Sequence, residues 1–330
     1  MNITLWTAAD ARIGIGHLRR TEALAQALRA NGVTPRLLFQ GDARLARLLA
    51  CEHQPIQRVD DFDQALLICA AEPGVLVSDL PGLRKEHSQR LHQAGCGPLV
   101  HLTDADGLRY QADVFLDGDA LDKPGIAQRT GGAEYNILRT SLLTKRPSRA
   151  WRLRKIRRVL VCLGGADPGY CTESLLASWQ RDVRLTLVAG PAVSVRRQRH
   201  WHAQLRHGDR LLRSPADLPG HLLRHDLVVT LGGITSYEAM CLGRPVAAVA
   251  WRHMSPYVRG MADAGLLNDL GSVQVAGRRL ARLLRRPARM AQRAGRAFNI
   301  LDGGGAERCA ALIIRLALNA NGSSSEGSKP

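Results

Sequence analysis

Aromatic residues and lysines are both scarce in this 330-residue chain, since aromatics make up 4% of it and only five of its 46 basic residues are lysines. So few rings argue against the base-stacking platforms that bind single-stranded nucleic acid. Long apolar runs are missing as well, which excludes the roughly 20-residue span of a transmembrane helix. The first residues, Met1 to Trp6, lack the basic and apolar segments of a secretory signal, so we expect a cytoplasmic protein.

Several familiar motifs are also missing. The sequence contains no P-loop pattern (G-x-x-x-x-G-K-[ST]) and no H-E-x-x-H zinc pattern. Its seven cysteines are scattered without a C-x-x-C pair. Such a set is typical of reduced thiols in a hydrophobic core, and not of a zinc site or a disulfide framework.

Two D-x-D patterns, Asp104 to Asp106 and Asp117 to Asp119, are the candidates for a divalent cation site. Asp is common in such loops because its side chain stabilises turns. Helix-end N–H groups and arginines can neutralise a phosphate ligand without a metal. We therefore expect no metal and no other cofactor.

The formal net charge of +17 is concentrated in three basic runs, at 145–158, 196–213 and 278–296. This balance fits three kinds of partner: nucleic acid, an anionic membrane surface, or an anionic substrate of an arginine-rich protein. No helix-turn-helix or zinc-finger pattern supports nucleic-acid binding, so we expect no such partner. We interpret the runs as solvated helix faces and a linker, with weak peripheral contact with anionic lipid left open, and expect a monomer.

Short apolar runs alternate with helix-patterned segments in both halves of the chain. These runs begin at Ile3, Pro35, Val75, Pro98, Val114, Val159, Leu185, Leu227 and Val246. The alternation predicts the α/β class, with two doubly wound, Rossmann-like domains facing across a cleft. We expect an N-terminal domain at 1–147, a linker at 148–158, a second domain at 159–318 and a disordered Ser/Gly-rich tail at 319–330.

A first glycine turn, Gly14-Ile15-Gly16-His17, follows the first apolar run and precedes a helix pattern. Glycines let backbone N–H groups approach a ligand, and the start of a helix favours negative charge. Arg19 stands where the dinucleotide fingerprint needs a small residue, so the fingerprint fails. His17 is a candidate general base, whose neutral form the helix start favours; a structural or capping histidine is the alternative.

A second glycine turn predicts a nucleotide site in the second half. It comprises Gly232, Gly233, Ile234, Thr235, Ser236 and Glu238, with Tyr237 between the last two. The N–H groups and the Thr235 and Ser236 hydroxyls suit a diphosphate, and Glu238 can accept both hydroxyls of a ribose. A plain glycine turn before a helix is the alternative. A third turn, Gly164-Gly165, either contacts the ligand or only shapes the cleft.

Five motifs occur in order along almost the whole chain. They are Asp10 to Arg20 (ending I-G-x-G-H-x-x-R), Gly132 to Arg139 (G-x-x-Y-x-x-L-R), Leu163 to Pro168 (L-G-G-x-D-P), Gly232 to Glu238 (G-G-x-T-x-x-E) and Asp302 to Arg308 (D-G-x-G-x-x-R). This set resembles the UDP-sugar hydrolases of pseudaminic acid biosynthesis, which act on a diacetamido-trideoxy sugar, and their spore-coat polysaccharide relatives. The resemblance implies the two-domain GT-B fold shared with the MurG glycosyltransferase.

The resemblance also implies roles for single residues. It makes His17 the base that activates the water attacking the anomeric carbon, so that UDP leaves with inversion. It implies substrate contacts at Asp79, Tyr135, Arg139 and His253. The sequence departs from the family at three places that face the sugar: Ala8 replaces an arginine, Asp79-Leu80-Pro81 replaces D-x-Tyr, and His253-Met254 replaces an Asn-Gln pair.

The expected function is therefore hydrolysis of a UDP-sugar to UDP and a free sugar for nonulosonic (pseudaminic) acid synthesis. An inverting UDP-sugar glycosyltransferase is the first alternative, because it needs the same base and leaving group with an acceptor hydroxyl in place of water. A non-catalytic nucleotide-sugar-binding module is the second.

Overall fold

The computed structural model describes residues 1–10, 15–46, 56–102, 110–119, 129–152, 155–179 and 182–325. Contacts divide the chain into two compact units. The first unit holds residues 1–119 and 123–140 together with the chain from Gly303 onward, and the second holds residues 120–122 and 141–302. Among the described helices, none is both long and apolar enough to cross a membrane.

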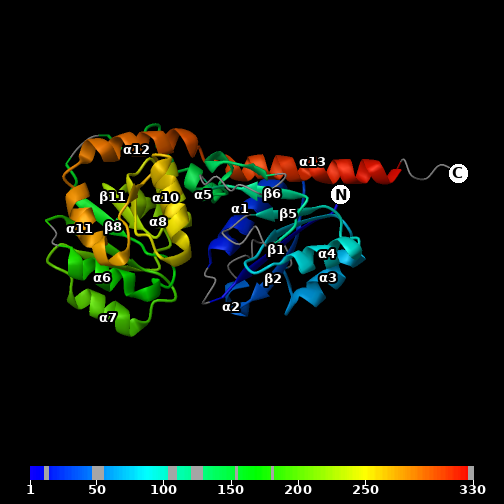
Figure 1. The fold of residues 1–330 in the computed structure, drawn as a ribbon, viewed down its shortest axis with the longest axis horizontal. Helices are drawn as coiled ribbons and strands as arrows, with labels where there is room; N and C mark the ends of the chain where they lie inside the picture. The colour runs from blue at the N-terminus through cyan, green and yellow to red at the C-terminus, as the bar shows by residue number, and fades with distance from the viewer. Residues whose placement is uncertain are drawn as a thin grey trace. The chain divides into compact units, whose positions relative to one another are not determined.

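The first unit is built on a seven-stranded sheet of order β3-β2-β1-β4-β5-β6-β7, in which all neighbours are parallel (Figure 1). Its strands are β1 (Ile3–Ala9), β2 (Arg36–Gly41), β3 (Ile56–Arg58), β4 (Val75–Asp79), β5 (Leu99–Leu102), β6 (Val114–Asp117) and β7 (Arg129–Gly131). Its helices are α1 (Gly16–Ala30), α2 (Ala43–Ala46), α3 (Phe62–Ala71), α4 (Lys85–Gln93), η2 (Ala133–Tyr135) and α13 (Gly305–Ser325), and α5 (Thr140–Leu143) spans the division between the units.

Both faces of this sheet are covered, as its alternating side chains show. Ile3 and Leu5 of β1 join one core cluster, to which α1 and α13 also contribute, while Trp6 and Ala8 join a second cluster with α3 and α4. A parallel strand buried on both faces reads as an unbroken apolar run. This explains why β1, β2, β4, β5 and β6 could be located from the sequence, whereas the short edge strands β3 and β7 were missed.

The last helix, α13, differs from its expected place. Its side chains at Ala306, Ala310, Ile313 and Ala317 are buried in a core cluster of the first unit, although the sequence placed them in the second domain. The helical period identifies a buried face but not the sheet that this face covers. The helix also continues to Ser325, so residues 319–325 of the expected disordered tail are helical. Once a helix is anchored by packing, each further residue adds a hydrogen bond at little cost.

The second unit contains a six-stranded parallel sheet of order β10-β9-β8-β11-β12-β13. Its strands are β8 (Arg158–Val161), β9 (Arg184–Ala189), β10 (Arg210–Arg213), β11 (Leu227–Thr230), β12 (Val246–Ala248) and β13 (Asn268–Asp269). Its helices are η3 (Pro168–Tyr170), α6 (Cys171–Ser178), α7 (Val195–Ala203), α8 (Leu218–Leu223), α9 (Ile234–Cys241), η4 (Arg252–Met254), α10 (Ser255–Asp263), α11 (Val273–Leu283) and α12 (Pro287–Ile300).

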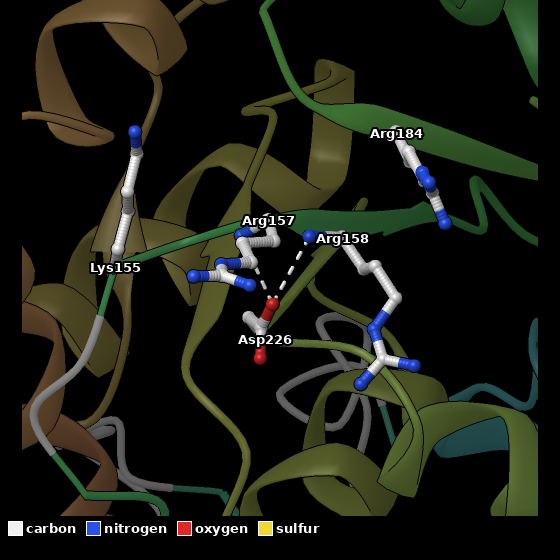
Figure 2. Close-up of a pocket in the computed structure, with 5 residues that line it drawn as sticks. All are labelled: Lys155, Arg157, Arg158, Arg184 and Asp226. Atoms are coloured by element: carbon white, nitrogen blue, oxygen red, sulfur yellow. Dashed lines mark hydrogen bonds between the residues drawn. The ribbon is translucent and has the colours of Figure 1, made fainter. Parts of the chain in front are cut away.

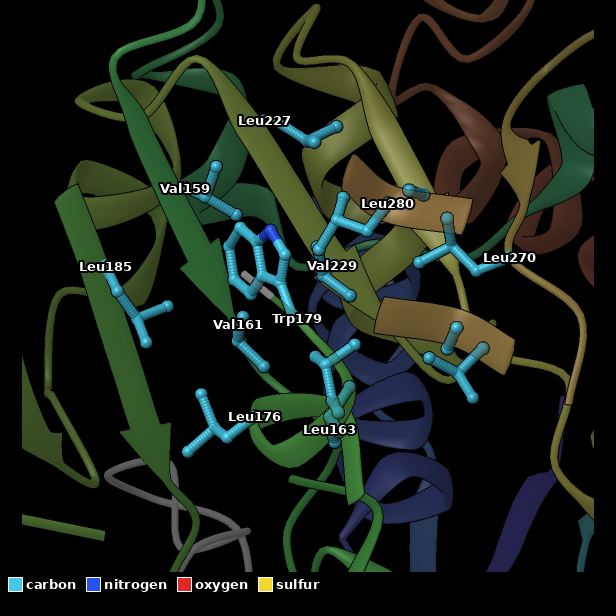
Figure 3. Packing of buried hydrophobic residues seen from close by; sticks show 14 of the residues in the cluster. Val159, Val161, Leu163, Leu176, Trp179, Leu185, Leu227, Val229, Leu270 and Leu280 are labelled. Atoms are coloured by element: carbon cyan, nitrogen blue, oxygen red, sulfur yellow. The ribbon is translucent and has the colours of Figure 1, made fainter. Parts of the chain in front are cut away.

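One face of this sheet packs around Trp179, which is 3% exposed and lies among Val159, Val161 and Leu185 (Figure 3). Trp151 and Ile156 belong to the same cluster. Part of the expected linker at 148–158 is therefore core of the second unit, and Arg158 already begins β8. The many basic residues of this segment led us to expect a linker, although Trp151 and Ile156 within it are buried.

The two sheets share one strand order. Counted along each unit, the first six strands of the first sheet and all six of the second are arranged 3-2-1-4-5-6, which is the Rossmann order. The predicted α/β class with two doubly wound domains is thus confirmed. In such sheets, ligands bind at the carboxyl ends of the strands where the order reverses. These switch points lie between β1 and β4 in the first unit, and between β8 and β11 in the second.

Candidate functional site

The switch point of the first unit brings His17 beside Asp79. Thr7 of β1 is the register partner of Asp79, the last residue of β4. Helix α1 follows β1 and begins at Gly16, and its first described helical bond joins the Arg19 N–H to the Ile15 carbonyl. His17 is therefore in the first turn of the helix, at the carboxyl edge of the sheet.

A short hydrogen bond joins the two side chains. Nδ1 of His17 lies 2.7 Å from Oδ1 of Asp79. The Asp79 side chain is 2% exposed and that of His17 is 16% exposed. The histidine is thus the more accessible member of the pair, and the carboxylate lies behind it.

Two further side chains of α1 hold the carboxylate. Arg20 donates from Nε to Oδ2 of Asp79 at 2.8 Å and also pairs through Nη2 with Oδ1. Thr21 donates its hydroxyl to Oδ2 at 3.4 Å. Burial alone would raise the pKa of Asp79, but the charges of Arg20 and His17 outweigh it and hold this pKa well below its usual range. Asp79 is therefore ionised at every working pH.

The ionised carboxylate fixes the state of the histidine. Since a carboxylate can only accept, the hydrogen of the short bond belongs to Nδ1 of His17. In the neutral ring, Nε2 then carries the lone pair and can take a proton. A carboxylate in this position orients the ring and stabilises the imidazolium that forms. The sequence had assigned Asp79 to the sugar, whereas in the structure its carboxylate contacts His17 and Arg20.

The switch point of the second unit is built mainly from backbone. Gly164, three residues beyond the end of β8, has a φ of +85°, which favours glycine. Gly165 accepts the Ala192 N–H at 3.0 Å and packs so closely on Gly190 that a Cβ there would lie 2.4 Å from the Gly165 carbonyl oxygen. This turn is therefore fixed by close approach of main chains.

The glycines of the second turn have different structural needs. Gly232 has a φ of +88°, and a Cβ on it would lie 2.6 Å from Val258 Cγ2. Gly233, the N-cap of α9, has an ordinary φ of −79°, and a Cβ on it would meet no described atom within 4 Å. A Cβ on Gly16 would also meet no described atom within 4 Å. Neither packing nor φ explains glycine at Gly16 and Gly233, which fits close approach by a ligand.

The hydroxyls after Gly233 are not equivalent. Ser236, which we expected to contact the ligand, is 0% exposed, and its Oγ hydrogen-bonds Thr230 Oγ1 at 2.7 Å, so this hydroxyl is engaged within the fold. Thr235 is partly exposed. Burial raises the pKa of the nearby Cys162 thiol to about 11, against the opposing effect of a hydrogen bond from Thr235. Glu238 is only 2% exposed, one turn into α9.

Arg197 of α7 contacts the turn after β8 through Asp167. The sequence analysis did not predict a role for this residue. Its Nη2 pairs with Oδ2 of Asp167 at 2.6 Å and with Oε2 of Glu173 at 2.7 Å. Its Nη1 donates to the Asp167 carbonyl at 2.9 Å. Burial raises the pKa of Asp167 to about 6, although the charge of Arg197 opposes this. The only sequence signal for this network was the Asp of the L-G-G-x-D-P motif.

The remaining predicted residues lie elsewhere or are not described. Tyr135 ends η2 and packs partly buried against the core of the first unit, and Arg139 follows it at intermediate exposure. Gly14 lies outside the described residues, and of His253 only the backbone, in η4, is described.

Only one of the two candidate metal-binding patterns lies within the described residues. The first D-x-D pattern, 104–106, lies outside the described residues. In the second pattern, Asp117 is 0% exposed and accepts the Asp119 N–H at 3.0 Å, which is the geometry of a turn. Within the described part of the chain, no group of three or more His, Cys, Asp or Glu side chains is placed to hold a metal ion.

Two proteins of known sequence are similar to this chain. It is 24% identical over 293 residues to the spore coat polysaccharide biosynthesis protein SpsG of Bacillus subtilis, with 82% of this chain and 84% of SpsG covered. It is 23% identical over 270 residues to the uncharacterized protein MJ1062 of Methanocaldococcus jannaschii, where 76% of this chain matches 55% of that protein. The chain thus spans about half of this second relative. No family model matches the chain.

Solved structures show the same fold at low identity. MurG of Acinetobacter baumannii matches with a TM-score of 0.67 at 14% identity, covering 96% of this chain and 100% of MurG. The spinosyn rhamnosyltransferase SpnG, solved with thymidine diphosphate, matches with a TM-score of 0.62 at 16% identity, covering 96% of this chain and 100% of SpnG. These matches confirm the predicted GT-B fold. The chain is thus a distant relative of SpsG with the GT-B fold of glycosyltransferases such as MurG.

Proposed function

We propose that this protein hydrolyses a UDP-sugar to UDP and free sugar with inversion at the anomeric carbon. The observation that carries the proposal is the His17–Asp79 pair at the switch point of the first unit. We infer a diacetamido-trideoxy sugar, as used for nonulosonic (pseudaminic) acids, from the five motifs shared with that hydrolase family. The similarity to SpsG, named for polysaccharide biosynthesis, supports sugar chemistry of this general kind.

The proposed reaction uses His17 as a general base. Nε2 takes a proton from water while the water oxygen forms a bond to the anomeric carbon. The bond from that carbon to the diphosphate oxygen breaks, and UDP leaves with the electron pair. The buried carboxylate of Asp79 stabilises the imidazolium, which then releases its proton to solvent.

We assign the leaving group to the second unit. Helices begin with partial positive charge, and the N-cap of α9 is Gly233, where a Cβ would meet no described atom within 4 Å. Thr235 adds a hydroxyl donor, and Glu238 is the acceptor that we assign to the ribose. Stabilising negative charge on the departing UDP in this way needs no metal.

A glycosyltransferase is the second candidate, and the fold matches favour it. SpnG, which shares the fold over almost the whole chain, is a rhamnosyltransferase by name. The same base and leaving-group site would then activate an acceptor hydroxyl instead of water.

The test is UDP release from a panel of UDP-sugars, with and without EDTA, with the sugar product followed by NMR. Hydrolysis predicts release in water alone, an inverted free sugar and no effect of EDTA. Release that begins only when an acceptor glycan is added would replace hydrolysis by transfer. UDP-sugar binding without any release under either condition would contradict both catalytic proposals.

A pair of variants assigns the base. His17→Ala removes the proposed base, whereas His202→Ala removes an exposed histidine on α7 and serves as the control. We expect release to fall only in the first variant. Undiminished release in His17→Ala would contradict the assigned mechanism.

A further inference from the structure

A basic hollow lies at the edge of the second sheet opposite the switch point. It has a volume of about 520 Å³ and is lined by Lys155, Arg157, Arg158, Arg184 and Asp226. Arg158 begins β8, Arg184 begins β9, and Asp226 directly precedes β11. All three positions are therefore at the amino ends of the strands, whereas the glycine turns follow the carboxyl ends.

The sheet places two of these arginines in direct opposition. Arg158 and Arg184 are register partners on adjacent parallel strands, and both are exposed. Like charges directly opposite on a sheet are destabilising. This arginine pair is therefore locally unfavourable. Locally unfavourable arrangements in natural proteins are expected mainly at functional sites.

The acidic residue of the hollow does not remove this charge. Asp226 is 3% exposed, and its Oδ2 accepts the backbone N–H groups of Arg157 and Arg158, each at 3.0 Å. Figure 2 shows this carboxylate between the two residues, with Arg184 on the neighbouring strand. In the described part of the chain, none of the four cationic side chains forms an ion pair. The hollow therefore keeps a net positive charge.

His225, a buried histidine next to Asp226 in the sequence, is affected by the charge of Arg158. His225 is 6% exposed, and its Nε2 lies 2.8 Å from the Thr186 hydroxyl. Burial lowers the pKa of His225, and the charge of Arg158 lowers it further. The charge of Arg158 thus acts on a buried group of the sheet, although the charge of Asp226 opposes it.

We propose that this hollow binds a phosphate-bearing anion, at a site separate from the nucleotide site proposed above. Guanidinium groups match phosphate oxygens in two parallel hydrogen bonds, and two arginines occupy register-paired positions on adjacent strands here. The volume falls within the range of small-ligand sites. An anion between Arg158 and Arg184 would turn their repulsion into attraction. Phosphate groups can come from a free phosphorylated compound or from a phospholipid headgroup, and the experiment separates these sources.

The experiment compares the wild-type protein with Arg158→Gln/Arg184→Gln and with a control, Arg278→Gln/Arg285→Gln. The control removes the same charge from exposed arginines of α11 and the segment after it, which do not line the hollow. One probe is inorganic pyrophosphate, titrated by calorimetry with UDP present in excess to occupy the nucleotide site. The other is pelleting with vesicles of phosphatidylcholine and phosphatidylglycerol.

We expect the double variant of the hollow to weaken binding of one probe by about tenfold or more, with the control close to wild type. Loss of pyrophosphate binding identifies a free phosphorylated ligand, and selective loss of pelleting identifies a lipid headgroup. Equal binding by all three proteins, or no binding of either probe by wild type, overturns the proposal. Because neither readout measures UDP release, failure here is distinguishable from failure of the proposed reaction.

A stability measurement provides a second readout. Without added anion and at low salt, Arg184→Gln removes one member of the like-charged pair, so its melting temperature should rise by about 1–3 °C. Pyrophosphate should raise the melting temperature of wild type more than that of the variant. A lower melting temperature for Arg184→Gln without anion would show that the arginine serves the fold and would overturn the proposal.

Discussion

The two switch points have the same strand order but are built from different groups. In the first unit, three ionisable side chains meet, because His17 and Arg20 both contact the carboxylate of Asp79. In the second unit, the corresponding edge consists of the glycine turns at Gly164 and Gly232. The charged side chains nearby, Asp167 and Arg197, are paired with each other. The first arrangement suits proton transfer and the second suits binding of an anion by backbone N–H groups.

The difference teaches that topology determines where a site is and local sequence determines what it can do. Both sheets place a turn and a helix start at the reversal of strand order. The pair in the first unit includes a histidine, which can act as a general base, whereas the pair in the second joins Asp167 to an arginine, which only donates hydrogen bonds. We therefore expect changes in the first unit to affect the rate of reaction, and changes in the second to affect nucleotide affinity or stability.

Removing the ionisable pair should have the largest effect. His17→Ala should lower kcat for UDP release by about 10²–10⁴-fold, because the base is lost. Asp79→Asn should also lower kcat, since a neutral amide no longer holds Nδ1–H toward a full negative charge. UDP affinity, measured by calorimetry, should stay close to wild type in both. A large loss of UDP affinity with unchanged kcat would reverse the proposed division of roles.

The pH dependence of stability should differ between wild type and Asp167→Asn. The folded pKa of Asp167, about 6, lies above its ordinary 3.8, so the folded state binds this proton more tightly than the unfolded state. The free energy of unfolding of wild type should therefore fall relative to the variant as pH rises from about 4 to 6, by up to about 3 kcal/mol.

Urea unfolding of both proteins across this pH range measures the difference. Asparagine tolerates the left-handed backbone of this position, where φ is +45°, so the variant should fold. Parallel pH profiles would show that Arg197 keeps Asp167 ionised throughout and would contradict the prediction.

Two neighbouring glycines sharpen the comparison within the second unit. Gly232→Ala should lower the free energy of unfolding by about 1–3 kcal/mol, because φ is positive and the new Cβ meets Val258. Gly233→Ala should leave stability within about 0.5 kcal/mol but weaken UDP binding about tenfold, since the methyl group fills the approach to the helix start.

Gly295→Ala on α12 is the matched control for Gly233→Ala, because its Cβ would also meet no described atom within 4 Å. It should leave UDP affinity near wild type and raise the free energy of unfolding by at most about 1 kcal/mol. Unchanged UDP affinity in Gly233→Ala would remove the main reason for placing the diphosphate at α9.

The smallest effect is expected at the buried hydroxyl of α9. Ser236→Ala removes the hydrogen bond to Thr230 and should cost about 0.5–1.5 kcal/mol of unfolding free energy, with UDP affinity unchanged. Thr235→Val serves as the comparison and should weaken UDP binding several-fold with little loss of stability. If Ser236→Ala alone weakened UDP binding, the hydroxyl would contact ligand despite its burial.

Local patterns were enough to predict nine of the described strands and the glycine turn before α9, but not β3, β7, β10 and β13. Apolar runs such as Val75 onward are short and continuous because parallel strands are buried on both faces. Glycine turns between a strand and a helix are visible because only glycine fits positions such as Gly164 and Gly232. These features depend on neighbours within a few residues along the chain.

The partners of those residues could not be predicted in the same way. His17 and Asp79 are 62 positions apart, and they meet because β4 pairs with β1 and not with the strand that precedes it in sequence. Ser236 looked like a ligand donor until Thr230 was found beneath it. Arg197 was one basic residue among many until α7 placed it on Asp167.

The sequence by itself determined the α/β class, the two Rossmann-like halves and the residue types at each strand end. These follow from short-range sterics and from the period of apolar residues. Only the tertiary structure decided that Asp79 serves His17, that α13 covers the first sheet, and that Arg158 stands opposite Arg184. Each of these depends on which strands and helices become neighbours, and that is set by packing of the whole unit.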